Sequence, residues 1–129
     1  MDNCIFCKIV NREIPSYKIY EDDKTYAFLD IANDFYGHTL VIPKKHSQNA
    51  LDTDTETLKA VIETVQKVSK HFVDNCGFEF VNLLSINEDV QHFHFHIIPR
   101  KKGDGVKLFR EFEKHNYNLA EISDKLKLN

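Results

Sequence analysis

This chain of 129 residues has little of what marks linkers or membrane spans. Its 4 glycines and 3 prolines stand singly, and no low-complexity segment or internal repeat is visible. No apolar run approaches the roughly 20 residues that a transmembrane helix needs. The opening stretch MDNCIFCKIV lacks the basic region and apolar core of a signal peptide. We therefore expect one domain over residues 1–129, without a linker, in the cytoplasm.

Excess positive charge and abundant cysteine are missing as well. The formal net charge is −3. Nucleic-acid-binding proteins usually carry a basic surface, so we expect no nucleic-acid partner. Only 3 cysteines are present, and in the cytoplasm they are expected to be thiols or metal ligands rather than disulfides. The chain is 42% hydrophobic and 29% charged, which is typical of a soluble globular domain.

The pattern of apolar residues predicts an α+β domain. Aromatic and β-branched segments predict five strands, at residues 17–20, 24–30, 38–43, 78–86 and 91–99. Between the third and the fourth, apolar residues recur every three or four positions from Leu58 to Phe72, which predicts one long helix. Thr53 or Asp54 can cap its start, and Gly77 can end it. We expect a mostly antiparallel sheet, and a short polar helix near residues 117–128.

The most unusual stretch is QHFHFHIIPR, in which three histidines alternate with apolar residues. Alternate side chains of a strand share a face, so His92, His94 and His96 should point one way. The phenylalanines between them should point into the core. A half-buried strand with a polar outer face is the plain interpretation, but such faces usually carry Thr, Lys, Glu or Ser.

Two chemistries fit three imidazoles in a row. Neutral imidazole is a good zinc ligand. It can also attack phosphorus and form a covalent intermediate that water later cleaves. Neighbouring positions on one strand face are about 7 Å apart, so one metal ion rarely takes all three rings. We therefore expect the three histidines to divide their roles.

Cys4 and Cys7 form a C-x-x-C pair. The pair can be a redox couple, two buried cysteines or two metal ligands. A redox couple of the thioredoxin kind would follow a strand and begin a helix within a βαβ pattern, which this sequence does not display. The spacing alone leaves the other possibilities open.

Several separated motifs, in order, resemble the histidine triad family. They are CIFCKIVNREIPSYKIYEDDKTYAFLDI near the start, GHTLVIPKKH in the middle, and HFHFHII followed by PR. The resemblance covers roughly residues 4–100 and does not extend to the tail from about residue 101. It implies an antiparallel sheet with one long helix, pairing into a homodimer. It also implies a purine nucleotide substrate and a nucleotidyl-histidine intermediate.

The resemblance assigns roles to individual residues. His94 aligns with the nucleophile, and His96 would contact a phosphate oxygen or assist the leaving group. A structural zinc would be held by Cys4, Cys7, His46 and His92. Asp30 would bind the ribose hydroxyls, and Asn87 also fits the pattern of the nucleotide site. The residues aligned with the walls around the base are Ile5, Phe6, Ile9, Phe28 and Ile31.

One departure from the family concerns the segment before the triad. Most members have a glycine-rich loop there that gives backbone amides and a hydroxyl to the phosphate. This chain has INEDVQH, about six residues shorter. Asp89 stands where a small hydroxyl residue is expected. The intact triad and Asp30 favour a nucleotide hydrolase or phosphoramidase; the short loop favours a nucleotide- or protein-binding adaptor with the same fold and zinc.

Overall fold

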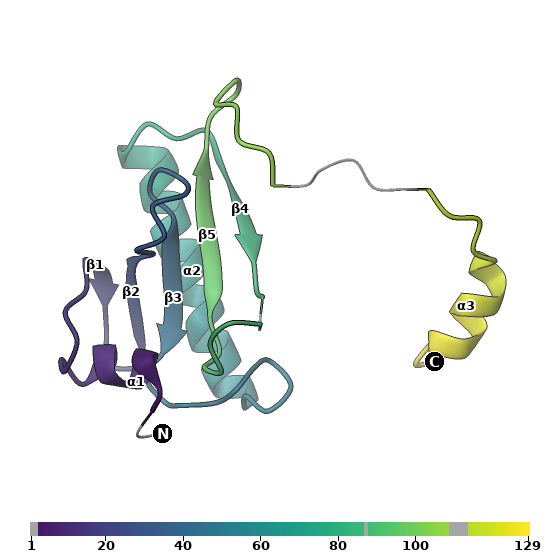
Figure 1. Ribbon diagram of the computed structural model, residues 1–129, viewed down its shortest axis with the longest axis horizontal. Coiled ribbons are helices and arrows are strands. Elements are labelled where there is room, and N and C mark those ends of the chain that lie inside the picture. The colour runs from purple at the N-terminus through teal and green to yellow at the C-terminus, as the bar shows by residue number, and fades with distance from the viewer. Residues whose placement is uncertain (1–2, 87, 109–113) are drawn as a thin grey trace.

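The protein folds around one five-stranded antiparallel sheet, seen in Figure 1. The computed structural model describes residues 3–86, 88–108 and 114–129. In chain order the elements are α1 (Ile5–Val10), β1 (Lys18–Glu21), β2 (Thr25–Leu29), β3 (Thr39–Pro43), α2 (Thr55–Asn75), β4 (Phe80–Leu84), β5 (Phe95–Arg100) and α3 (Leu119–Leu126). The strand order is β1-β2-β3-β5-β4. The predicted α+β class, the five strands and the long helix are confirmed.

Helix α2 covers one face of the sheet (Figure 1). Its buried residues Val61, Val65 and Val68 pack against Val41 of β3 and Ile97 of β5. Phe93, just before β5, is also fully buried in this cluster. The apolar side of the HFHFH stretch therefore faces the helix, as the alternation predicts.

A second apolar cluster lies on the other face of the sheet, where α1 packs. Phe6 and Ile9 of α1 contact a layer of strand residues that includes Phe28 and Leu40. Leu40 pairs with His96 across β3 and β5, and directly paired residues share a face. The histidine side of β5 is therefore the side on which α1 packs.

The ends of α2 agree with the sequence signals. The Asp54 carboxylate accepts a hydrogen bond from the Thr57 amide at 2.8 Å, so Asp54 rather than Thr53 is the N-cap. At the other end Cys76 is the C-cap, and Gly77 follows with a φ of +81°. Glycine takes that left-handed conformation without a steric penalty, which explains why the helix ends there.

Several bounds differ from those predicted. Helix α1 was not foreseen; it begins because the Cys4 sulfur accepts the Cys7 amide at 3.4 Å, an unusual N-cap. Ladder pairing of β5 begins only at Phe95, so His92 and His94 precede the strand. The tail helix α3 begins after its N-cap, Asn118. It stands apart from the sheet in Figure 1 and has no buried residue.

Within the described residues, no helix is sufficiently long and apolar to span a membrane.

Candidate active site and metal centre

The histidines around β5 lie on one face, although only His96 belongs to the strand. His92 is fully buried and His94 almost so, and both rings meet the edge or face of the Phe6 ring, with centroids 5.8 and 5.2 Å away. His96 follows, with its ring centroid 5.0 Å from that of His94. Phe6 of helix α1 therefore packs against two of the three rings and holds them in place.

His94 is fixed in one tautomer by its own neighbour. Its Nδ1 lies 2.7 Å from the carbonyl oxygen of His92. A carbonyl can only accept, so Nδ1 carries the proton and donates it. In the neutral ring the lone pair is then on Nε2, which leaves that nitrogen able to attack an electrophile. The Ser85 hydroxyl donates to the backbone carbonyl of His94 at 2.9 Å and fixes the backbone on the other side.

His96 is joined to a chain of hydrogen bonds that the sequence did not reveal. Its Nδ1 lies 2.8 Å from Nε2 of His38, and Nδ1 of His38 lies 2.8 Å from the Asp34 carboxylate. Because the carboxylate accepts, His38 donates from Nδ1 and accepts from His96 through Nε2. No role was predicted for His38, which lies directly before β3 in the stretch GHTLVIP.

Burial and hydrogen bonding set the protonation states along this series of hydrogen bonds from His96 to Asp34. Desolvation, with smaller contributions from His94 and His38, lowers the pKa of His96 from 6.5 to about 4. Burial also acts against the charge of Asp34, but the hydrogen bond from His38 and those from backbone amides outweigh it, and the pKa of Asp34 is lowered. At neutral pH the chain therefore consists of neutral His96 linked through His38 to an ionised carboxylate.

Cys4, Cys7, His46 and His92 come together from α1, from the segment after β3 and from the segment before β5. Nδ1 of His92 lies 3.3 Å from the Cys4 sulfur, 3.5 Å from the Cys7 sulfur and 3.1 Å from Nδ1 of His46. The Cys7 sulfur lies 3.3 Å from Nδ1 of His46. All four candidate ligand atoms lie within 4.8 Å of one another. The four residues predicted as metal ligands thus form one cluster.

The chemistry of this cluster fits a tetrahedral zinc ion. Zinc bonds to sulfur and nitrogen imply ligand atoms about 3.3–3.8 Å apart, close to the separations found here. Nε2 of His92 donates to the Pro43 carbonyl at 2.8 Å, which leaves Nδ1 without a proton and aimed at the sulfurs. Burial, and then the neighbouring Cys4 thiol, raises the pKa of Cys7 to about 11. A bound cation would stabilise both thiolates.

The antiparallel sheet argues against a thioredoxin-like redox pair. Cys4 does begin a helix, which is one half of that pattern. However, every pair of neighbouring strands in the described sheet is antiparallel, so no βαβ unit exists there. The histidines beside the sulfurs favour metal binding instead.

The residues predicted to bind the nucleotide divide into two groups. Phe6 and Ile9 of α1 and Phe28 of β2 are buried together in the cluster on the α1 side of the sheet. Ile5 and Ile31 are exposed. Asp30 is half-buried; its Oδ1 accepts from the Ala32 amide at 2.8 Å, and its Oδ2 lies 3.7 Å from Nε2 of His38. Asn87 lies outside the described residues.

Charged residues on either side of the triad bear on phosphate binding. Asp89, in the short segment before His92, is exposed. Lys101 and Lys102 are cations that could neutralise a phosphate in place of the missing loop, but they follow the far end of β5. Lys101 is seven positions from His94 in extended chain, about 23 Å at 3.3 Å per residue. Within one chain the two lysines are therefore too far away, and the Lys101 amine instead lies 5.6 Å from the centre of the Phe78 ring.

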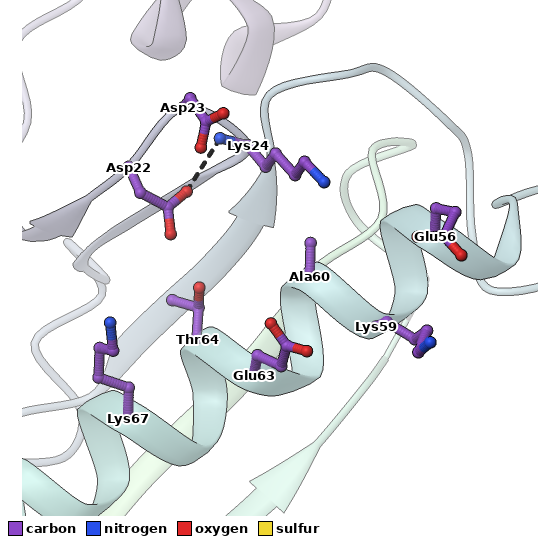
Figure 2. Close-up of a pocket in the computed structure, with 9 residues that line it drawn as sticks. All are labelled: Asp22, Asp23, Lys24, Glu56, Lys59, Ala60, Glu63, Thr64 and Lys67. Carbon is purple, nitrogen blue, oxygen red and sulfur yellow. Dashed lines mark hydrogen bonds between the residues drawn. The ribbon is translucent and has the colours of Figure 1, made fainter.

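A separate groove of about 450 Å³ lies between the β1–β2 turn and α2, as Figure 2 shows. Its wall combines Asp22, Asp23, Glu56 and Glu63 with Lys24, Lys59 and Lys67. The charges alternate in sign, and none of the predicted site residues lines it. We interpret it as solvated surface.

Comparisons with known proteins agree with the geometry. The HIT domain family model matches residues 11–103. An uncharacterized HIT-like protein of Borreliella burgdorferi is 42% identical, with 95% of this chain and 98% of that protein covered. An adenosine 5'-monophosphoramidase of Schizosaccharomyces pombe is 42% identical, with coverage of 76% and 74%. The crystal structure of a zinc-bound histidine triad family protein from Mycobacterium smegmatis has a TM-score of 0.79, 31% identity and coverage of 87% and 85%.

The metal cluster leads to a first prediction. Protein purified without added metal should contain one zinc per chain, and the Cys4→Ala, Cys7→Ala double variant should contain none. Elemental analysis gives both values, and the exposed Cys76, outside the cluster, supplies the control Cys76→Ala. Removing the metal should also lower the unfolding temperature, since its binding energy contributes to folding. Zinc retained by the double variant would contradict the ligand assignment.

The low pKa of His96 leads to a second prediction. Between pH 6.5 and about 4 the unfolded chain binds a proton at this position that the folded chain does not, so stability falls as the pH falls through that window. In His96→Asn this contribution is lost. On going from pH 7 to pH 5, the urea midpoint of wild type should therefore fall by more than that of His96→Asn. A difference that is independent of pH would contradict a depressed pKa.

Proposed function

Because the chain belongs to the HIT domain family, we propose that it is a nucleotide hydrolase acting through a nucleotidyl-histidine intermediate at His94. Its substrates would be purine nucleoside monophosphates that carry an amine, phosphate or nucleotide leaving group. The observation that carries the proposal is the fixed tautomer of His94, with Nδ1–H donated to the His92 carbonyl and Nε2 left as a nucleophile.

The reaction would proceed in two displacements. Nε2 of His94 attacks the α-phosphorus, a nitrogen–phosphorus bond forms, and the bond from phosphorus to the leaving group breaks. The leaving group takes up a proton from solvent as it departs, and the water that attacks in the second step returns one to solvent. A water molecule then attacks the same phosphorus, the bond to His94 breaks, and the nucleoside monophosphate is released with neutral His94. The sum is hydrolysis, with one water consumed.

The hydrogen-bonded chain through His38 supports a role for His96 in both steps. With a phosphate oxygen at its Nε2, His96 would donate a proton there and accept from His38 at Nδ1. This arrangement needs one more proton than the pair holds in the free protein. That proton would be taken up from solvent with the anionic substrate, and the ionised Asp34 would stabilise the positive charge shared by His38 and His96. An anionic substrate would thus bring His96 into the donor form that the free protein disfavours.

The remaining assignments follow from where the residues lie. Asp30 has one carboxylate oxygen committed to the Ala32 amide and the other available for ribose hydroxyls. The exposed Ile5 and Ile31 are available to contact a base. The two thiols and two imidazoles of the Cys4 cluster would hold a structural zinc, because four protein ligands leave no open position.

A second candidate function is a nucleotide- or protein-binding adaptor with little activity. The shortened segment before His92 favours it, since a glycine-rich loop would otherwise supply donors to the phosphate. The adenosine 5'-monophosphoramidase relative and the fixed tautomer of His94 favour the hydrolase. The two functions differ in whether a covalent intermediate forms.

The third prediction tests His94. With adenosine phosphoramidate, wild-type protein should accumulate an adenylyl group on His94 that mass spectrometry detects. His94→Ala should lose turnover by at least about a thousandfold while adenosine monophosphate still binds. His94→Gly should regain activity with added imidazole. His71→Ala, an exposed position on α2, is the control. Near wild-type turnover in His94→Ala would contradict the mechanism.

The fourth prediction tests the short segment before the triad. Losing one preorganised donor to a developing oxyanion typically costs about a hundredfold to a thousandfold in rate, so wild-type turnover should be slow. An ionised Asp89 would repel the phosphate, and Asp89→Ser should therefore raise the single-turnover rate. Asp23→Ser, an exposed carboxylate in the charged groove, should leave the rate unchanged. If Asp89→Ser has no effect but Lys101→Ala slows the reaction, the partner chain of a dimer supplies the cation.

The fifth prediction is the homodimer. Strand β4 is an edge of the described sheet and leaves Phe80, Leu83 and the nearby Ile86 exposed, as an isologous interface would require. Light scattering at micromolar concentration should give twice the mass of the chain. Leu83→Lys should shift the protein towards monomer, whereas Ile62→Lys, at an exposed apolar position on α2, should not. A wild-type monomer at these concentrations would contradict the proposal.

A further inference from the structure

We propose that Asp30, His38 and His96 form a second, weaker site for a divalent transition-metal ion such as zinc, separate from the cysteine-containing cluster. Their ligand atoms lie within 4.8 Å of one another, and none of the three residues is exposed. Two imidazoles and one carboxylate are the ligand set of many three-residue zinc and iron sites, with water at the open positions.

The environment of His38 is that of a metal ligand. Metal-bound histidines usually donate their second ring N–H to a carboxylate, which fixes the tautomer and raises the basicity of the ligand nitrogen. Asp34 accepts from Nδ1 of His38 at 2.8 Å, so Nε2 presents its lone pair to the space shared with His96 and Asp30. The ring of His38 is buried and cannot turn this nitrogen towards solvent.

The carboxylate of Asp30 is also fixed in advance. Its Oδ1 accepts from the Ala32 amide at 2.8 Å, which leaves Oδ2 free at 3.7 Å from Nε2 of His38. A metal ion at this point would be bound by Oδ2 and by Nε2 of His38. Two of the three ligands are therefore oriented before any metal arrives.

His96 has to change its tautomer. Its Nδ1 now donates a proton to Nε2 of His38 over 2.8 Å, whereas two zinc-bound nitrogens are about 3.3 Å apart. The metal would replace the shared proton, the rings would separate by roughly 0.5 Å, and the proton of His96 would move to Nε2. This cost explains why the site should bind more weakly than the cluster with two thiolates.

Occupation of the site would withdraw Asp30 and His96 from a nucleotide. This consequence rests on the proposed function, because it assumes that the two residues bind ribose and phosphate. The metal site itself rests only on the hydrogen bonds and distances among these side chains. Its test therefore measures metal binding without nucleotide and without turnover.

The experiment is a Co²⁺ titration of protein that already holds one zinc per chain. In wild type, one further equivalent should bind, with visible ligand-field absorption but without a thiolate-to-cobalt charge-transfer band, because the new ligands are nitrogen and oxygen. Elemental analysis after the titration should show that the first zinc is retained. A thiolate band with loss of zinc and no extra equivalent bound would overturn the proposal.

Three variants locate the cobalt. Asp30→Asn should abolish the second equivalent, and Asp34→Asn should weaken it about 10–100-fold, the usual effect of removing a carboxylate behind a ligand histidine. Asp23→Asn, which removes a carboxylate from the groove of Figure 2, should change nothing. Unaltered cobalt binding in Asp30→Asn, with circular dichroism equal to wild type, would overturn the assignment.

Discussion

His92 is held at three points, and the rest of the site depends on it. Its Nε2–H donates to the Pro43 carbonyl at the end of β3, its Nδ1 faces the two thiols of the α1 segment, and its own carbonyl accepts from His94. The ring and the backbone of one residue thus connect the metal cluster to the candidate nucleophile. A zinc ion there would fix the carbonyl that sets the tautomer of His94, although it would take no part in bond breaking.

Three groups that can only accept hydrogen bonds determine which ring nitrogen of each histidine is left without a proton. The Pro43 carbonyl leaves Nδ1 of His92 to a metal, the His92 carbonyl leaves Nε2 of His94 to an electrophile, and the Asp34 carboxylate leaves Nε2 of His38 to its neighbour. Histidine side chains are therefore prepared for three different proposed roles, as ligand, nucleophile and relay. The acceptor that faces each ring, rather than the residue type, determines which of these roles the ring is suited to.

The sequence predicted the fold well because its periodicities are local. The alternation in HFHFH and the three–four spacing of α2 each report which face a residue occupies, and both faces were confirmed. Helix α1 was missed because its N-cap is a cysteine sulfur, which no propensity rule anticipates. His38 and Asp34 were missed for a different reason: their role depends on the pairing of β3 with β5, and register is a long-range property.

The two faces of the β5 segment also explain why the chemistry lies where it does. On the side of Phe93 and Ile97, the long helix α2 excludes water and leaves no room for a ligand. On the side of the histidines, Phe6 of the six-residue helix α1 packs against the rings of His92 and His94. His96 remains only half-buried. A short helix thus gives His94 a largely dry environment, which strengthens its hydrogen bond, while it leaves His96 open to a polar ligand.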